Sequence, residues 1–169
     1  DYAIIAVGAH NMEMPIPHDN SNIVSSWDVL NGQEVNGDCV VIGGGLVGAE
    51  TAEYLANKGH QVTIVEMMDK IAAGESTTVL PLMMKDFADH HVKQLVNTKV
   101  DHIENNIVYT ENDQIKADTI INALGSKKNI FDDSSITIPH VCVGDCSGER
   151  TADIASAIRT AYHAANAID

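Results

Sequence analysis

A glycine-rich turn is the part of this sequence best suited to bind a charged ligand. Residues 43–48 read Gly-Gly-Gly-Leu-Val-Gly and satisfy the pattern GxGxxG. In such a motif Gly43 permits a tight turn, Gly45 lets a pyrophosphate approach the backbone, and Gly48 lets a helix pack closely on a strand. Free N–H groups at the helix start then bind phosphate oxygens. The residues expected to line this site are Gly43, Gly44, Gly45, Leu46, Val47 and Gly48.

A carboxylate follows this turn at the spacing that a dinucleotide site requires. Residues 39–42 and 62–65 are short β-branched runs that predict strands, and residues 46–58 carry apolar side chains at helical spacing between them. Glu66 ends the second run, where a carboxylate can accept hydrogen bonds from both ribose hydroxyls of an adenosine. The alternative is a glycine-rich turn with an unrelated surface carboxylate. The order strand, turn, helix, strand and acid favours nucleotide binding.

Two neighbours of this motif have competing interpretations. Glu50 lies two residues past Gly48, on what we expect to be the first helical turn, where a carboxylate favours the positive helix end. By that argument alone Glu50 is a capping residue. Met67 and Met68, with Met83 and Met84, could wall an adenine pocket, although methionine at helical spacing more often fills gaps in a core.

A second candidate site lies near the end of the sequence. Residues 140–143 predict a strand that runs into Gly144-Asp145, where a carboxylate could bind a hydroxylated cofactor chain. Thr151 and Ala152 then open an alanine-rich helix over residues 151–168. On its own, a Gly-Asp pair is most often only a turn.

The cysteines and histidines predict no metal site. The eight histidines are scattered, and Cys39, Cys142 and Cys146 have neither zinc-ligand nor Cys-x-x-Cys spacing. We expect reduced thiols that act as small core residues, which favours a cytoplasmic location.

Composition excludes several classes of protein. The 169 residues are 44% hydrophobic, and ten Lys and Arg against 24 Asp and Glu give a formal net charge of -14. A chain of this size can bury one self-standing core. Nucleic acid and anionic membrane surfaces are poor partners for so acidic a chain. No apolar run approaches the length of a membrane span, and the sequence opens without a basic or transit-like targeting segment.

A weak internal repeat links two parts of the chain. Residues 1–8 and 118–125 each contain an Asp, an apolar run and Ala-x-Gly at one spacing. The second copy has a glycine-rich start upstream, whereas nothing precedes the first, so we expect the first unit to have lost its beginning. The other expected elements are a strand at residues 1–9, an irregular linker at 10–37, a helix within 74–91 with Ser76 or Thr77 as cap, and an antiparallel meander from 94–96, 100–103, 107–110 and 115–122.

Residues 40–55 together with 62–67 closely resemble the nicotinamide-binding domain of flavoprotein oxidoreductases that bind two dinucleotides. They are similar in particular to the C-terminal part of the NADH:flavin oxidoreductase group, which includes 2,4-dienoyl-CoA reductase and 2-enoate reductase. Ala123, Leu124 and Gly125 look like the end of that domain. Residues 141–146 resemble the second FAD motif, and residues 6–9 resemble the end of the first FAD segment.

The resemblance implies an α/β, Rossmann-like three-layer FAD/NAD(P)-binding fold with a parallel sheet and a small antiparallel meander. It implies three parts. Residues 1–37 would be the end of the first FAD segment plus a linker, residues 38–126 the NAD(H)-binding domain, and residues 127–169 the returning FAD segment.

The resemblance also implies cofactors and roles. Gly43, Gly45 and Gly48 would hold the NAD pyrophosphate, Glu66 the adenosine ribose, and Glu50 would lie near the nicotinamide. Asp145 would bind the ribityl chain of FAD, and the helix that begins at Thr151 and Ala152 would face the flavin. FAD would be shared with a missing N-terminal segment, while FMN and an iron-sulfur cluster would belong only to the full-length parent.

The function implied is transfer of hydride from NADH to FAD and on to an upstream flavin domain that reduces an activated C=C bond. We expect the isolated fragment to be inactive. The alternative is a structural domain that holds ADP or NAD without catalysis. A standalone carbonyl dehydrogenase is disfavoured, because we expect no Tyr-x-x-x-Lys or other proton-transfer pair positioned for that chemistry.

Overall fold

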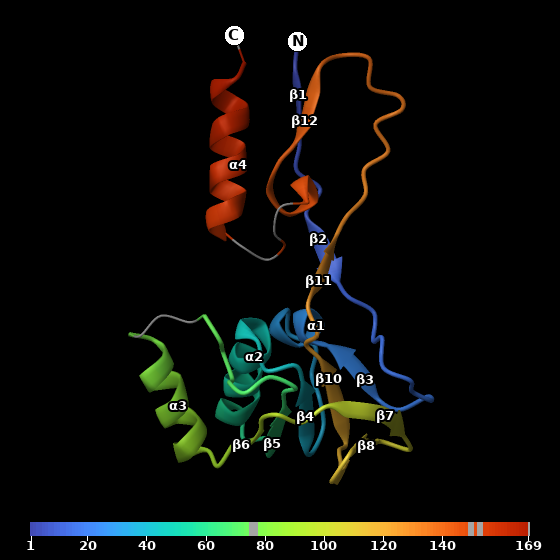
Figure 1. Ribbon diagram of the computed structural model, residues 1–169, viewed down its shortest axis with the longest axis vertical. Coiled ribbons are helices and arrows are strands. Elements are labelled where there is room, and N and C mark those ends of the chain that lie inside the picture. The colour runs from blue at the N-terminus through green and yellow to red at the C-terminus, as the bar shows by residue number, and fades with distance from the viewer. Residues whose placement is uncertain (75–77, 149–150, 152–153, 169) are drawn as a thin grey trace. The chain divides into compact units, whose positions relative to one another are not determined.

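The computed structural model spans residues 1–169 and describes all of them except residues 75–77, 149–150, 152–153 and 169 (Figure 1). The chain divides into two compact units. The larger comprises residues 13–125, and the smaller comprises residues 1–12 with residues 126–169. Each unit is described by itself.

The larger unit is built on a parallel sheet with strand order β3-β10-β4-β5-β6 (Figure 1). The chain runs outward from β4 through β5 to β6, and then returns to the other side of β4 as β10. The sheet therefore has a topological switch point between β4 and β10, the position where open α/β sheets bind ligands. The strands are β3 (Ile23–Ser25), β4 (Cys39–Ile42), β5 (Val62–Val65), β6 (Lys93–Leu95) and β10 (Thr119–Asn122).

Among its described residues this unit has three helices: α1 (Ser26–Leu30), α2 (Leu46–Asn57) and α3 (Leu80–Asp89). Helix α2 connects β4 to β5, and it ends where Gly59 takes a φ of 92°. Pro81 lies in the first turn of α3, where its missing N–H costs no helical hydrogen bond. The helix expected within residues 74–91 is thus shorter than that range, and Ser76 and Thr77, the expected caps, lie outside the described residues.

The second sheet of this unit is an antiparallel meander of β7 (Val100–Glu104), β8 (Ile107–Thr110) and β9 (Gln114–Lys116). The expected meander is too wide, because its first piece, 94–96, overlaps β6 of the parallel sheet, and the end of its last piece, 115–122, is β10 of that sheet, while the start of that piece stays in the meander as β9. All four residues of β10 are buried. A strand covered on both faces belongs in the middle of a parallel sheet rather than in a half-exposed meander.

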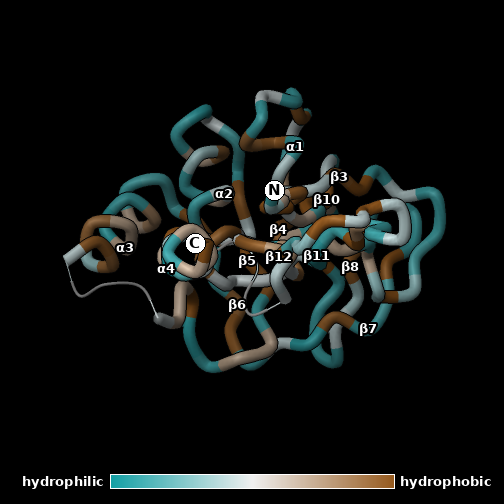
Figure 2. The backbone as a smooth tube through the Cα atoms, turned by 90° about the horizontal axis from the view of Figure 1, so that it is seen from above, coloured by the Kyte–Doolittle hydropathy of each residue, from teal (hydrophilic) through white to brown (hydrophobic). Residues whose placement is uncertain are grey.

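Alternation along β4 separates two hydrophobic cores. Cys39 and Val41 join the cluster that contains residues of α2 and α3, whereas Val40 and Ile42 join the cluster that contains Val108 and other meander residues. The sheet is therefore the middle of three layers, as the sequence predicts, and the tube through its central strands is largely apolar (Figure 2).

The smaller unit holds two short strand pairs and a helix. β1 (Ala3–Ile5) pairs in parallel with β12 (His140–Cys142), and β2 (Ala9–Asn11) pairs antiparallel with β11 (Ser126–Lys128). A 3-10 turn, η1 (Gly144–Ser147), precedes helix α4 (Ile154–Asn166).

Three expectations need correction here. The strand expected at residues 1–9 is broken between β1 and β2, where Gly8 has a φ of 71°. The linker expected at residues 10–37 contains β3 and α1, because Val29 is fully buried and the Ser25 hydroxyl caps that helix by accepting a hydrogen bond from the Asp28 N–H at 3.0 Å. Helix α4 occupies less of the range 151–168 than expected.

Within the described residues, no helix is long and apolar enough to cross a bilayer.

Candidate dinucleotide-binding site

The turn after β4 requires glycine at its first position. Gly43 has a φ of 101°, and a Cβ there would lie 2.6 Å from the carbonyl oxygen of Ala123 at the end of β10. The Gly43 N–H donates to the Val65 carbonyl at 2.9 Å. Gly43 therefore lies between the ends of β5 and β10, at the switch point of the sheet.

The other two motif glycines differ in their surroundings. A Cβ at Gly48 would collide with the carbonyl oxygen of Gly43, so helix α2 can start this close to the strand only without a side chain. A Cβ at Gly45 would meet no atom within 4 Å, and Gly45 is exposed. Packing explains Gly48 but not Gly45, which leaves Gly45 open to a ligand.

Helix α2 presents an uncapped N-terminus at this turn. Its N-cap is Gly45, which offers no side chain, and the first 5→1 hydrogen bond runs from the Ala49 N–H to the Gly45 carbonyl at 2.9 Å. The N–H groups of Leu46, Val47 and Gly48 therefore lack partners one turn back in the helix. Such an end carries a partial positive charge and suits a phosphate.

Glu66 lies directly beneath the turn, and its carboxylate is held by two backbone groups. The Gly44 N–H donates to Oε2 at 2.6 Å and the Met68 N–H donates to Oε1 at 2.7 Å. The residue is 9% exposed. Because a carboxylate has about four acceptor positions, each oxygen keeps capacity for one ribose hydroxyl.

Met67 and Met68 follow Glu66 and are 65% and 58% exposed. The core interpretation is therefore wrong for these two residues, whereas it holds for Met83, which is buried, and for Met84, which packs against the same core. Their exposure beside Glu66 leaves them available to cover a flat apolar ring such as adenine.

The end of β10 completes this side of the site. The buried Ala123 donates its N–H to the Ile42 carbonyl at 2.9 Å, and the Leu124 N–H donates to Asn122 Oδ1 at 3.3 Å. Gly125 is exposed with a φ of 114°. The structure thus brings residues 123–125 and the glycine turn to one edge of the sheet.

Glu50 lies beyond the first turn of helix α2. Helix α2 begins at Leu46 and has no acidic residue in its first turn, so the capping interpretation of Glu50 is wrong. The side chain is exposed, and its charge contributes to a raised pKa of Glu53, whose main causes are burial and the neighbouring Asp86.

The second candidate site lies in the smaller unit. Gly144 has a φ of 66°, and its N–H donates to the Thr160 hydroxyl of α4 at 2.8 Å, which ties η1 to that helix. Asp145 is half-buried within η1, and the Thr151 hydroxyl donates to the Ser126 carbonyl at 3.3 Å. Ala152 lies outside the described residues.

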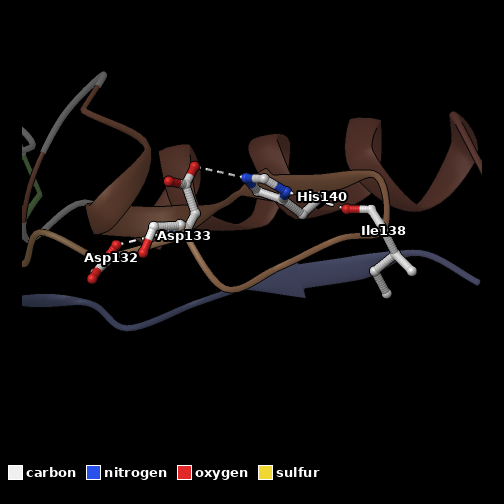
Figure 3. A network of polar contacts seen from close by, with 5 residues as sticks. Asp132, Asp133, Ile138 and His140 are labelled. Carbon is white, nitrogen blue, oxygen red and sulfur yellow. Dashed lines mark hydrogen bonds and ion pairs between the residues drawn. The ribbon is translucent and has the colours of Figure 1, made fainter.

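The first residue of β12, His140, pairs with a carboxylate on the loop that precedes this strand (Figure 3). His140 Nε2 lies 2.8 Å from Asp133 Oδ2, and His140 Nδ1 lies 3.4 Å from the Ile138 carbonyl. The hydrogen bond to Asp133, and then that to Ile138, raises the pKa of His140.

Among the cysteines, burial and the nearby Asp38 and Asp118 raise the pKa of Cys39 to about 11. Cys39 and Cys146 are buried as expected, whereas Cys142 is only half-buried.

Sequence reasoning missed two features. A Tyr-x-x-x-Lys spacing does occur, at Tyr54 and Lys58, contrary to expectation. Tyr54 lies in the C-terminal half of α2 and Lys58 is its C-cap residue, and Lys58 Nζ lies 4.7 Å from the Tyr54 ring centroid. At about 1.5 Å per residue this pair is roughly 9 to 15 Å along the helix from Gly48, so it is not aligned with the glycine turn. The second feature is the contact of Ile71 and Ala72 with Gly44, which the residue types at these positions do not predict.

Comparison with known proteins defines the family. The sequence profile named "Pyridine nucleotide-disulphide oxidoreductase" matches residues 1–140, and the chain belongs to that family. Membership implies FAD and a pyridine nucleotide as cofactors, and it places the chain among oxidoreductases. The narrower group that includes 2,4-dienoyl-CoA reductase is not established by this match.

The relatives are much longer than this chain. It is 44% identical to the bilirubin reductase of Mediterraneibacter gnavus over 177 residues, covering 99% of this chain and 28% of that protein. It is 47% identical to the NADH oxidase of Thermoanaerobacter brockii over 78 residues, covering 43% of this chain and 12% of that protein. The chain therefore spans less than a third of either relative.

Solved structures share the fold. A 2-naphthoyl-CoA reductase superposes with a TM-score of 0.83 at 26% identity, covering 96% of this chain and 26% of that one. The histamine dehydrogenase of Rhizobium sp. 4-9 superposes with a TM-score of 0.85 at 19% identity, covering all of this chain and 31% of that one. At 19% identity the second likeness concerns the fold alone.

Proposed function

We propose that this chain is the NADH-binding part of a flavin-dependent reductase. The observation that carries the proposal is the uncapped start of α2 beside a carboxylate that keeps two acceptor positions, both at the switch point of a parallel sheet. The helix end would neutralise the pyrophosphate, and the exposed Gly45 would let it approach the backbone. Glu66 would accept the two ribose hydroxyls.

The same geometry supports NADH over NADPH. A 2′-phosphate carries about -1.5 to -2 charges at neutral pH, and it would meet the Glu66 carboxylate where a ribose hydroxyl donates a hydrogen bond. Among residues 67–70, which follow Glu66, Asp69 adds a further negative charge and Lys70 is the one cation.

FAD, when bound, accepts a hydride from the nicotinamide and passes electrons onward. For this chain we propose that Glu50 lies near the nicotinamide, that Asp145 binds the ribityl chain, and that the segment at Thr151 and Ala152 faces the flavin. The exposure of Glu50 and the left-handed backbone at Gly144 are compatible with these roles.

We propose further that the chain works within a longer polypeptide, which supplies the rest of the FAD site and a domain that reduces an activated C=C bond. Its coverage of only 28% of bilirubin reductase supports this, as do relatives and neighbours named as reductases of bilirubin and of a naphthoyl-CoA thioester. FMN and an iron-sulfur cluster would belong to that upstream part. The proposed division is residues 1–37, 38–126 and 127–169, and the unpaired thiols suit a reducing compartment such as the cytoplasm.

Titration calorimetry of the chain with NADH, NADPH and ADP-ribose tests the binding proposal. We expect NADH and ADP-ribose to bind and NADPH to bind more weakly. Absence of NADH binding, or tighter binding of NADPH, would refute it.

A second candidate is a structural ADP or NAD site without catalysis, because the turn and Glu66 would hold an adenosine diphosphate whether or not hydride moves. Stopped-flow measurement of flavin reduction by NADH in the full-length protein separates the two. Flavin bleaching within the turnover time supports transfer, and a flavin that stays oxidised while NADH binds supports the structural site.

A further inference from the structure

The backbone of Gly44 is held on three sides. Its N–H donates to Glu66 Oε2 at 2.6 Å, and its carbonyl accepts a hydrogen bond from the Ala72 N–H at 2.7 Å. On its Cα, a Cβ would lie 2.5 Å from Ile71 Cδ1. Gly44, Ile71 and Ala72 are all buried. The segment 71–72 therefore closes over the middle of the glycine turn.

This contact sets the direction of the next N–H group. The Gly44 carbonyl and the Gly45 N–H belong to one planar trans peptide unit, so they point in opposite directions. Holding the carbonyl toward Ala72 therefore turns the Gly45 N–H away from residues 71–72. That N–H forms no hydrogen bond to another described residue, and Gly45 is the exposed glycine of the turn.

The preceding peptide unit is fixed in the same way. The Gly44 N–H points to Glu66, and the carbonyl of Gly43, at the other end of that unit, lies against Gly48. Both peptide planes of the turn are thus determined before any ligand binds. Preorganised donors avoid the cost of ordering the loop when a ligand binds.

Ala72 adopts a strained backbone to make this contact. Its φ is 50°, a conformation unfavourable for a residue with a Cβ. The other non-glycine residues at positive φ in the described chain are His91, Asn97, Asn105 and Asn106. Asn and His tolerate that region better than alanine, so the strain at Ala72 is the exception. Such strain persists where the surroundings determine the conformation, often at ligand sites.

We propose that Ile71 and Ala72 are positioning residues, which fix the glycine turn so that the Gly45 N–H faces the pyrophosphate of a bound dinucleotide. The assignment rests on the proposed function, since it concerns the same site. Neither residue needs to touch the nucleotide. They act through Gly44, from a segment outside the GxGxxG motif.

The contact between Ile71 and Gly44 can be tested by rescue. Gly44→Ala adds a Cβ against Ile71 Cδ1, and Ile71→Val deletes that carbon. We expect Gly44→Ala to raise the calorimetric dissociation constant for NADH and ADP-ribose by about 10-fold, and Ile71→Val in that background to recover roughly 3-fold or more, as for contacting residues. The matched control is Ile64→Val, a buried isoleucine in the same core cluster that supplies none of the three atoms nearest to a Cβ at Gly44, which belong to Ile71 and Glu66. Equal effects of the two valines would overturn the assignment.

Amide hydrogen exchange tests the role of Ala72 without a nucleotide. In the free 169-residue chain we expect the Ala72 amide to be protected and the Gly45 amide to exchange quickly, with Gly45 becoming protected when ADP-ribose is added. An Ala72 amide that exchanges like an exposed loop would overturn the inference even if NADH binds. Failure of the proposed function has a different signature, because Ala72 would then stay protected while NADH and ADP-ribose fail to bind.

Discussion

Replacing Gly45 with alanine should separate nucleotide binding from folding. Gly45 has a φ of -63°, which alanine adopts without strain, and its Cβ would meet no atom within 4 Å. Alanine allows the unfolded chain fewer conformations than glycine does, which stabilises the folded Gly45→Ala variant by about 0.4 to 1 kcal/mol. Losing glycine at the N-cap costs a similar amount, roughly 0.5 to 1 kcal/mol. We therefore expect the free energy of unfolding to be nearly unchanged.

Binding should respond very differently. The new methyl group occupies the space through which the pyrophosphate reaches the N–H groups of residues 45–47. A hydrogen bond to a charged group contributes roughly 1.5 to 3 kcal/mol, so loss of one weakens NADH about 10- to 150-fold. Titration calorimetry with NADH and ADP-ribose measures this loss, and thermal unfolding of the same samples checks the fold.

Gly48→Ala is the matched comparison, because its Cβ would collide with the Gly43 carbonyl oxygen. Overpacking of this kind costs about 1 to 3 kcal/mol, which lowers the melting temperature of a chain of this size by roughly 2 to 12 °C. NADH affinity that survives Gly45→Ala intact would refute the reasoning, since the exposed glycine would then not be the approach to the backbone.

Further predictions concern charge, cofactor retention and pH. Glu66→Ala should weaken NADH about 10- to 150-fold and narrow its preference over NADPH, measured by calorimetry, because the ribose hydroxyls lose their acceptor and a 2′-phosphate loses its repulsion. In the full-length protein, Glu50→Gln should slow flavin reduction by NADH in stopped flow without lowering the melting temperature, whereas a lower melting temperature with normal reduction would indicate a structural role. The purified chain should retain little FAD, because we expect pyrophosphate and adenosine contacts to come from elsewhere, and a yellow protein with stoichiometric FAD in its visible spectrum would contradict this. The pKa of His140 is raised in the folded protein, so the pairing of protonated His140 with Asp133 contributes to stability. This contribution is complete below a pH of about 6.5, the ordinary histidine pKa, and is lost as pH rises through the higher folded pKa. An NMR titration should show Asp133→Asn returning the His140 pKa toward its ordinary value, and no change would refute the pairing.

Local sequence patterns predicted the strands and helix around the glycine turn well. The strand, glycine turn, helix and acid from Cys39 to Glu66 carry their own signals, because β-branched runs, glycine spacing and helical periodicity all act over a few residues. The predicted strand at residues 62–65 coincides with β5, and α2 differs from its predicted range by one residue. These boundaries depend on local chemistry, such as the left-handed Gly59 after the helix.

Long-range partners set what the patterns missed. Residues 119–122 look like any apolar strand, and only their pairing with β3 and β4 places them in the parallel sheet. The capping interpretation of Glu50 failed although the predicted helix start agrees with α2, because residue 50 is the fifth residue of a helix that begins at Leu46 and therefore lies beyond its first turn. Ala72 gives no signal at all, because a backbone N–H looks the same in every residue type except proline.

The place of β10 in the sheet has a consequence for how the nucleotide site comes into being. Asp38 donates its N–H to Asp118 Oδ2 across 80 positions of the chain, and β4 and β10 pair directly beyond these residues. Closing so long a loop is entropically costly and slows folding. Gly43 meets Ala123 only after that closure. During synthesis the turn and Glu66 emerge early, yet the candidate site is complete only when β10, the last strand of the sheet, has paired with β4. A nascent chain that ends before residue 119 should therefore not be stabilised by NADH.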